Sequence, residues 1–216
     1  MEKMKNLIFD FDGTLVDTAP VILATMQAAI KELGLPSKTE EECRSTIGLR
    51  LEEIPAVLWK NRDDLSATYA ATYRRIFDEL KRPIRVECFP GVDEGLKKLH
   101  AYGYRIAIAS SRSHKSLDEY VTAFGWGYLL DAVVGGNDVE HGKPAPDAVL
   151  VICRKLGWKP EECLMTGDAI YDILMGKNAG TATCGVAYGN QDRRQLKSAE
   201  PDFIVNEFKE LVDRLV

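Results

Sequence analysis

Short apolar segments alternate with helical segments from about residue 88 to the C-terminus, and this alternation constrains the fold most strongly. The apolar segments are YRIAIAS (104–110), DAVVGG (131–136), CLMTGD (163–168), TATCGVAYG (181–189) and DFIVN (202–206). Segments with helical spacing separate them, such as SLDEYVTAF (116–124) and PDAVLVICRKLG (146–157). Strands that alternate with helices predict an α/β fold with a doubly wound, mainly parallel, Rossmann-like sheet.

The first strand is separated from this series by a long helical stretch. KNLIFDF (5–11) is a consecutive apolar run, which is typical of a strand covered on both faces. Thr18 is a candidate helix cap, Pro20 suits a first turn, and apolar residues then recur at helical spacing up to Gly34. Only helical signals follow, to about Leu80. We therefore expect a core domain of residues 1–15 and 87–216, with a helical subdomain of residues 16–86 inserted after the first strand.

Polar residues follow several of the predicted strands. In open α/β sheets, ligands bind outside the carboxyl ends of the strands, so these residues are expected to meet at one edge. They are Asp10 and Asp12 after the first strand, Ser110, Ser111 and Arg112 after RIAIA, and Asp168 with Asp172 after CLMTG, together with Lys143 in HGKPAPD.

Each of these residues has an ordinary structural explanation when it is taken alone. A single aspartate after a strand often forms a turn, and serines before a helix act as caps. Acids at the start of a helix interact favourably with the helix dipole. Lysine is most often a solvated side chain. The convergence of all of them on one predicted edge, with a glycine after Asp12 that permits close backbone approach, favours a functional site.

Phosphoryl transfer with a divalent metal is the chemistry that needs this set. Mg²⁺ prefers carboxylate, carbonyl and phosphate oxygens. Asp10 and Asp168 would supply carboxylates, and the metal would offset their mutual repulsion. A carboxylate can also act as a nucleophile and form an aspartyl-phosphate, while hydroxyl, lysine and backbone N–H groups hold the phosphoryl oxygens.

Four motifs in order, DFDGT (10–14), ASS (109–111), GKP (142–144) and GDAIYD (167–172), give the chain a family resemblance. It resembles the haloacid dehalogenase superfamily of phosphotransferases, in particular members with a helical cap inserted after the first strand. The resemblance covers essentially the whole chain. FDFDGTLVDT and HGKPAPD are most similar to phosphoglycolate phosphatase-like enzymes.

The resemblance implies a role for each matching residue. Asp10 would be the nucleophile that attacks phosphorus. Asp12 would protonate the leaving oxygen and later activate water. Ser110 and Lys143 would bind phosphoryl oxygens, and Lys143 would also balance the charge of Asp10. Ser111 stands where many relatives have asparagine, and it is a candidate for substrate binding.

The resemblance also implies a Mg²⁺ site. Its ligands would be Asp10, the backbone carbonyl of Asp12, and Asp168, with Asp172 either binding the metal or supporting Asp168. The cap would close over this site and exclude water.

The loop TIGLR (46–50) resembles the glycine-containing cap loop that faces the active site in relatives. Gly48 and Arg50 are therefore candidates for substrate binding, because the planar guanidinium of Arg50 suits carboxylate or phosphate. The alternative is that Arg50 is a solvated residue at a helix start. Arg112 is a weaker candidate of the same kind. The helical spacing of Trp59, Tyr69 and Tyr73 favours the core of the cap over a platform for substrate.

Composition limits the kinds of partner that we expect for this protein. The formal net charge is -5 with acids and bases interspersed, which argues against nucleic acid or a membrane surface and leaves a small phosphorylated molecule as the expected partner. Five dispersed cysteines, an odd number without a CxxC pair, indicate reduced thiols. With no signal-peptide core and no membrane span, we expect a cytoplasmic protein, monomeric or a small homo-oligomer.

The sequence leaves alternatives to a phosphatase of small phosphorylated metabolites or pyrophosphate. A phosphomutase would use the same Asp10 and Asp12, and only its products would distinguish it. A dehalogenase also uses an aspartate nucleophile but needs neither a metal nor an acid at position 12. A binding domain without catalysis would be expected to lack at least one of Asp10, Asp12, Lys143 and Asp168, and all four are present. Gly142-Lys143 does not match a P-loop, and His141 has no expected catalytic role.

Overall fold

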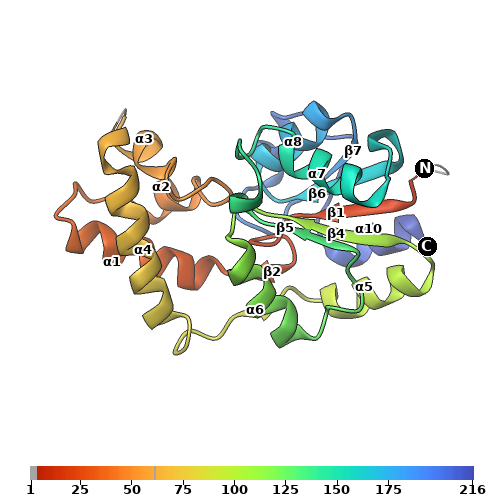
Figure 1. The fold of residues 1–216 in the computed structure, drawn as a ribbon, viewed down its shortest axis with the longest axis horizontal. Helices are drawn as coiled ribbons and strands as arrows, with labels where there is room; N and C mark the ends of the chain where they lie inside the picture. The colour runs from red at the N-terminus through yellow and green to blue at the C-terminus, as the bar shows by residue number, and fades with distance from the viewer. Residues whose placement is uncertain (1–3, 61) are drawn as a thin grey trace.

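The computed structural model describes residues 4–60 and 62–216, and a six-stranded sheet lies at its centre (Figure 1). The strand order is β5-β4-β1-β6-β7-β8, and every neighbouring pair is parallel. The strands are β1 (Asn6–Phe9), β4 (Arg105–Ala109), β5 (Ala132–Val134), β6 (Cys163–Gly167), β7 (Ala182–Val186) and β8 (Phe203–Val205). The predicted α/β fold with a parallel sheet is confirmed.

Strand β1 lies in the middle of the sheet and is covered on both faces, which explains its consecutive apolar residues. Leu7 and Phe9 pack into one buried cluster, whereas Ile8 belongs to the cluster on the opposite face. The helices α5 (Val92–Ala101), α6 (His114–Phe124) and α10 (Phe208–Leu215) contribute to the first cluster; α7 (Asp147–Leu156) and α8 (Ile170–Ala179) contribute to the second. A short helix that the sequence pattern did not predict, α9 (Arg193–Lys197), follows β7.

Four helices form a separate layer beside the sheet, on the left of Figure 1. They are α1 (Ala19–Glu32), α2 (Glu40–Arg44), α3 (Ile54–Leu58) and α4 (Ser66–Leu80), with a 3₁₀ turn at Asp63–Leu65. We call residues 19–80 the helical insertion. It has an apolar cluster of its own, in which Tyr69 is fully buried and against which Trp59 packs. Tyr73 also belongs to this cluster.

The two chain segments that join the helical insertion to the core run side by side. The sequence predicts no strand between residues 16 and 86, but the structure places β2 (Val16–Asp17) there, paired antiparallel with β3 (Glu87–Cys88). A strand of two residues is too short to leave a periodic pattern in the sequence, and its pairing arises because both crossing segments pass through the same place.

All five cysteines are free thiols. In the described part of the chain, no helix combines the length and the apolar character that spanning a membrane requires.

Candidate active site

Three parallel strands end next to one another and carry polar residues to the same edge of the sheet. Asp10 follows β1, Ser110 follows β4, and Asp168 follows β6; β4 and β6 are the two neighbours of β1. All three side chains are buried, with no more than 3% of their surface exposed. The edge that the sequence predicted as a meeting point is therefore formed by central strands, where burial strengthens electrostatic interactions.

Lys143 links two of the acids. Its ammonium makes ion pairs with Asp10 and, at 2.6 Å, with Asp172 Oδ1. Burial disfavours the charged lysine, but the two carboxylates outweigh this effect and raise the pKa of Lys143. Burial also raises the pKa of the Asp10 carboxyl, and the ammonium of Lys143 opposes that rise. A buried cation thus compensates part of the negative charge at the edge.

Asp10, Asp168 and Asp172 form a cluster suited to a cation. One carboxylate oxygen from each lies within 4.8 Å of the other two. Asp10 Oδ2 is buried and has no hydrogen-bond partner among the described residues. Burial, with a further contribution from the charge of Asp172, raises the pKa of Asp168 to about 7. A buried oxygen without a partner, in a cluster of three hard oxygen donors, fits Mg²⁺.

Asp168 is fixed by residues that the sequence analysis did not single out. Thr14 Oγ1 donates to Asp168 Oδ1 at 3.2 Å. The backbone N–H and the side-chain Nδ2 of Asn190 donate to Asp168 Oδ2 at 2.6 and 2.8 Å. Asn190 follows β7 in the chain, so the rule applied to the other strands, namely to inspect the polar residues after each strand, would have found it.

Gly13 allows this part of the site to close up. Its φ is +84°, in the left-handed region, and a Cβ atom there would lie 2.1 Å from Asp168 Oδ2 and 2.2 Å from Asn190 Nδ2. Any other residue would therefore strain the backbone and push apart the acids that follow β1 and β6.

Asp12 points to a different partner from Asp10. Arg112 donates to its carboxylate from Nη2 at 2.5 Å and from Nε at 3.1–3.2 Å. Thr18 Oγ1 also donates to Asp12, at 2.6 Å. Thr18 stands at the N-cap of α1, as the sequence predicts, but its hydroxyl donates to Asp12 and makes no capping bond to the helix. This contact ties the start of the helical insertion to the DxD motif.

Arg112 is held among aromatic rings. Its guanidinium carbon lies 5.1 Å from the ring centroids of both Phe77 and Tyr120, and Phe77 belongs to α4 of the helical insertion. Only 8% of the side chain is exposed. Arg112, a weak candidate for substrate binding by sequence, thus connects Asp12 to the helical insertion.

The predicted loop TIGLR lies against the core. Ser111 Oγ donates to the carbonyl of Gly48 at 2.6 Å, and Gly48 has a φ of +105°. Arg50 donates from Nη1 to the carbonyl of Glu140 at 2.7 Å and from Nη2 to that of Val139 at 2.9 Å. Both predicted substrate-binding residues of this loop therefore contact segments that carry site residues, since Glu140 stands three residues before Lys143.

Ser110 and His141 make contacts with residues near them in the chain. Ser110 Oγ accepts a hydrogen bond from the backbone N–H of Arg112 at 3.2 Å, and Ser113, instead of Ser110 or Ser111, caps α6. His141 Nδ1 lies 3.0 Å from Asp147 Oδ2 on α7.

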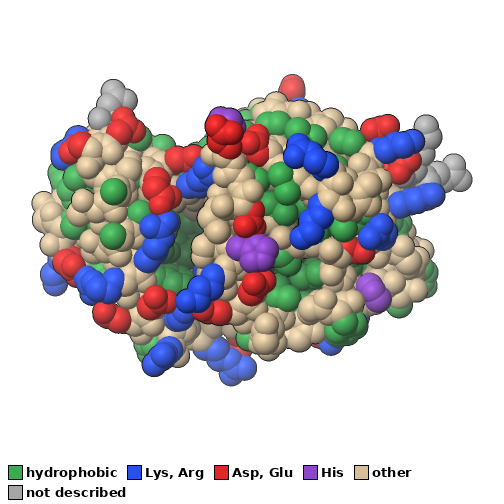
Figure 2. All heavy atoms as spheres, in the orientation of Figure 1, with side chains coloured by type: hydrophobic (Ala, Val, Ile, Leu, Met, Phe, Trp, Pro, Cys, Tyr) green, Lys and Arg blue, Asp and Glu red, His purple; other side chains and the backbone are tan. Residues whose placement is uncertain are grey.

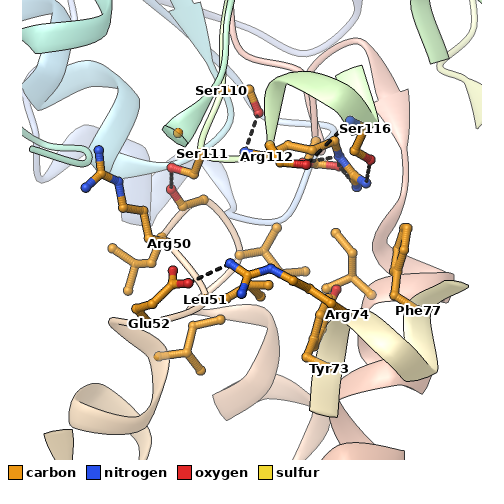
Figure 3. A pocket seen from close by; sticks show the side chains of 18 of the residues that line it. Arg50, Leu51, Glu52, Tyr73, Arg74, Phe77, Ser110, Ser111, Arg112 and Ser116 are labelled. Carbon is orange, nitrogen blue, oxygen red and sulfur yellow. Dashed lines mark hydrogen bonds and ion pairs between the residues drawn. The ribbon is translucent and has the colours of Figure 1, made fainter. Parts of the chain in front are cut away.

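A cavity of about 640 Å³ lies between the edge of the sheet and the helical insertion (Figure 3). Asp10, Asp12 and Ser110 line it from the core, and residues of the loop 46–54 and of α4 line it from the other side. The close-up shows Tyr73, Arg74 and Phe77 facing Ser110, Ser111 and Arg112 across this space. A cavity of this volume is in the range of small-molecule sites.

Comparisons with known proteins agree with this geometry. Residues 7–186 match the sequence model of the haloacid dehalogenase-like hydrolase family. A protein of Dickeya dadantii named "Probable phosphatase IndB" is 40% identical over 214 residues, covering 97% of this chain and 93% of the relative. A phosphoglycolate phosphatase of Psychrobacter arcticus is 30% identical over 218 residues, covering 97% and 95%. A crystal structure of a haloacid dehalogenase-like hydrolase from Bacteroides fragilis superposes with a TM-score of 0.91 at 27% identity, covering 97% and 100%.

Proposed function

The chain belongs to the haloacid dehalogenase-like hydrolase family, and from this premise we propose that it is a Mg²⁺-dependent phosphatase that uses Asp10 as nucleophile. Relatives named as phosphatases, matched over nearly their whole length, support hydrolysis of a phosphate ester. The observation that carries the mechanism is Asp10 Oδ2, a buried carboxylate oxygen without a partner among the described residues. Asp10 lines the cavity and lies beside two further acids.

Asp10 would attack the phosphorus of the substrate. The new bond joins an oxygen of Asp10 to phosphorus while the bond from phosphorus to the leaving oxygen breaks, which yields an aspartyl-phosphate. Lys143, fixed next to Asp10, would hold negative charge on the phosphoryl group, and Ser110 would donate a hydrogen bond to it. Because Lys143 is already held by Asp10 and Asp172, little reorganisation is needed when charge develops.

Asp12 would move the proton in both steps. As an acid it would give its proton to the leaving oxygen, and as a base it would take a proton from the water that attacks the aspartyl-phosphate. That attack breaks the bond to Asp10 and releases inorganic phosphate. Asp12 lines the cavity and is held by Arg112 and Thr18, which supports a role toward a leaving group that would occupy the cavity.

Asp10, Asp168 and Asp172 would hold the metal, together with the backbone carbonyl of Asp12. Bound Mg²⁺ would neutralise part of the charge on the phosphoryl oxygens. Thr14 and Asn190 would keep Asp168 oriented, because they occupy its two carboxylate oxygens with hydrogen bonds.

Residues 16–86 would act as a cap over this site. The contacts Ser111–Gly48 and Arg50–Val139 join the helical insertion to the core on one side of the cavity. The short two-stranded pairing of β2 with β3 lies where the cap would hinge.

Release of inorganic phosphate tests the proposal. The wild-type protein with Mg²⁺ is expected to release phosphate from small esters, to lose activity in EDTA, and to regain it when Mg²⁺ is added in excess. Isomerised sugar phosphate without free phosphate would indicate a phosphomutase. Undiminished turnover by Asp10→Asn or in EDTA would refute the mechanism.

A further inference from the structure

We infer that the substrate is the phosphate monoester of a neutral alcohol that carries a flat ring, such as a nucleoside 5′-monophosphate, and that it is not a short acidic ester such as phosphoglycolate. This inference rests on the proposed function and concerns only the leaving group. It follows from the size, the wall and the charge balance of the cavity that opens onto Asp10.

The helical insertion contributes almost all of the apolar side chains that line the cavity. Apart from Val139, the apolar side chains that line the cavity come from the helical insertion, among them Ile22, Met26, Leu51, Ile54, Tyr73 and Phe77. Burial of apolar ligand surface against such side chains stabilises the bound state. A cavity of about 640 Å³ would leave most of these side chains uncovered if the leaving group were glycolate.

Two largely buried aromatic rings, Tyr73 and Phe77, belong to the lining on this side of the cavity. Tyr73 and Phe77 lie one helical turn apart on α4, with ring centroids 5.9 Å apart and planes inclined by only 14°. Phe77 reaches the catalytic edge through Arg112, whose guanidinium lies over its ring and also binds Asp12. The alcohol that Asp12 would protonate therefore leaves toward an aromatic surface, which favours a ring in the leaving group.

The charges around the cavity cancel. Among the described residues, five basic side chains line it: Arg50, Arg74, Lys81, Arg112 and Lys115. Besides the nucleophile Asp10, five acidic side chains line it as well: Asp12, Glu52, Glu53, Asp78 and Glu119. Figure 2 shows both signs interspersed around the hollow between the helical insertion and the core.

Three of the five cations are already paired with acids. Arg74 pairs with Glu52 at 2.5 Å, and Lys81 pairs with Asp78 and Glu119 at 2.8 and 2.9 Å. Arg112 is bound to Asp12, and both Nη atoms of Arg50 donate to backbone carbonyls. Lys115 is exposed at the rim. The Nε of Arg50 has no partner among the described residues, but it is buried. A carboxylate on the leaving group would therefore have to displace an acid from Arg74, Lys81 or Arg112 or reach Lys115 at the surface, which is unfavourable.

Selectivity of the wild-type enzyme with Mg²⁺ tests the inference. We expect kcat/KM for benzyl phosphate and for adenosine 5′-monophosphate to exceed that for phosphoglycolate at least tenfold. Equal or higher kcat/KM for phosphoglycolate would overturn it.

Acetyl phosphate separates this test from the test of the proposed function. It is small and reactive, so it needs the chemistry of Asp10 but not the apolar wall. Without hydrolysis of acetyl phosphate the proposed function itself fails. If acetyl phosphate is hydrolysed but the ring-bearing esters are not preferred over phosphoglycolate, only the inference about the leaving group fails.

Variants on one helix locate the selectivity. Phe77→Ala is expected to lower the ratio of kcat/KM for benzyl phosphate to that for acetyl phosphate at least fivefold, mainly through KM. Ile76→Ala is the matched control, because Ile76 is equally buried in the helical insertion but does not line the cavity. An equal change in both variants would contradict the role of Phe77. Phe77→Leu keeps an apolar side chain and removes the ring, and it serves if the alanine variant does not fold.

Removal of one acid from the cavity lining tests the argument from charge balance. Glu52→Gln removes the acidic partner of Arg74, and we expect it to raise kcat/KM for phosphoglycolate relative to benzyl phosphate threefold or more. Glu79→Gln is its control, since Glu79 pairs with Arg75 on the same helix away from the cavity. No change in the ratio for Glu52→Gln would count against the charge argument.

Discussion

The edge of the sheet that carries Asp10, Lys143 and Asp172 differs from the helical insertion in where its charges lie. At the edge, Lys143 and its partners Asp10 and Asp172 are all at least 95% buried and bound to one another. In the helical insertion the ion pairs lie on the surface, such as Arg75–Glu32, in which both side chains are 51% exposed, and the interior is apolar. Buried charges cannot be removed singly without leaving an uncompensated partner, whereas exposed pairs are screened by water. We therefore expect substitutions at the edge to lower activity or stability strongly. Substitutions in the helical insertion should change substrate selectivity, or leave activity and stability close to those of the wild type.

Asp10→Asn gives the largest expected effect. The amide is a poor nucleophile, so kcat should fall by about 10³-fold or more, as is usual when a catalytic nucleophile is removed. The shape of the side chain is kept and the fold should persist. Phosphate release measures the activity, and far-UV circular dichroism of the same preparation measures the fold. Activity within tenfold of wild type would assign the nucleophile elsewhere.

The loss of activity in Asp12→Asn should depend on how much the leaving group needs a proton. For an alkyl phosphate, which needs a proton on the leaving oxygen, we expect kcat/KM to fall by about 10²–10⁴-fold. For p-nitrophenyl phosphate, whose leaving group needs no proton, the fall in the first step should be smaller. Pre-steady-state release of p-nitrophenol isolates that step. An equal loss for both esters would indicate that Asp12 acts on the site's geometry and not as an acid.

Lys143→Met tests the buried charge directly. The methionine keeps most of the volume but leaves Asp10 and Asp172 without their cation, and breaking such a buried pair costs about 3–5 kcal/mol of stability. Urea unfolding of the metal-free protein measures it. The double variant Lys143→Met with Asp172→Asn should recover part of the loss, and no recovery would contradict the ion pair as the cause.

Metal-free stability should depend on pH through Asp168. Burial raises its pKa to about 7, above the ordinary value of 3.8, so between these values the folded state holds a proton that the unfolded state has released. The free energy of unfolding without metal should therefore fall as pH rises from 5.5 to 8. Mg²⁺ competes with that proton, and its stabilising effect should be larger at pH 8.

Thermal unfolding in EDTA and in Mg²⁺ at both pH values measures this difference. Asp168→Asn should reduce the pH dependence and remove most of the response to Mg²⁺; the pKa of Asp10, also raised by burial, accounts for the pH dependence that remains. An equal shift of the midpoint by Mg²⁺ at pH 5.5 and 8 in the wild type would contradict the assignment.

The smallest expected effect lies on the surface of the helical insertion. Arg75→Gln breaks pairs with Glu32 and Glu79 that are exposed to solvent. Because water and salt screen such pairs, the urea midpoint and the kcat of the variant should match the wild type. A loss comparable to that of Lys143→Met would remove the contrast between the two regions.

Much of this arrangement could be predicted because it depends on short stretches of chain. The run LIFDF places Asp10 at the end of a buried strand, and ASS and GDAIYD stand in the same relation to β4 and β6. The β2–β3 pairing could not be predicted, since two residues leave no periodic signal. Asn190, which holds Asp168, was missed although its position after β7 offered the same signal as the other motifs.

The parallel sheet and the edge at which its motifs meet could be predicted from the sequence, because strand patterns and α/β alternation are local properties repeated along the chain. Which side chains pair at that edge depends on the tertiary packing. Arg112 reaches Asp12 across 100 residues, and Arg50 reaches the carbonyl of Val139 across 89. Such pairings depend on how helices and loops pack around the cavity. The same packing gives the cavity its aromatic wall and its balance of charge, and with them the expected preference among phosphate esters.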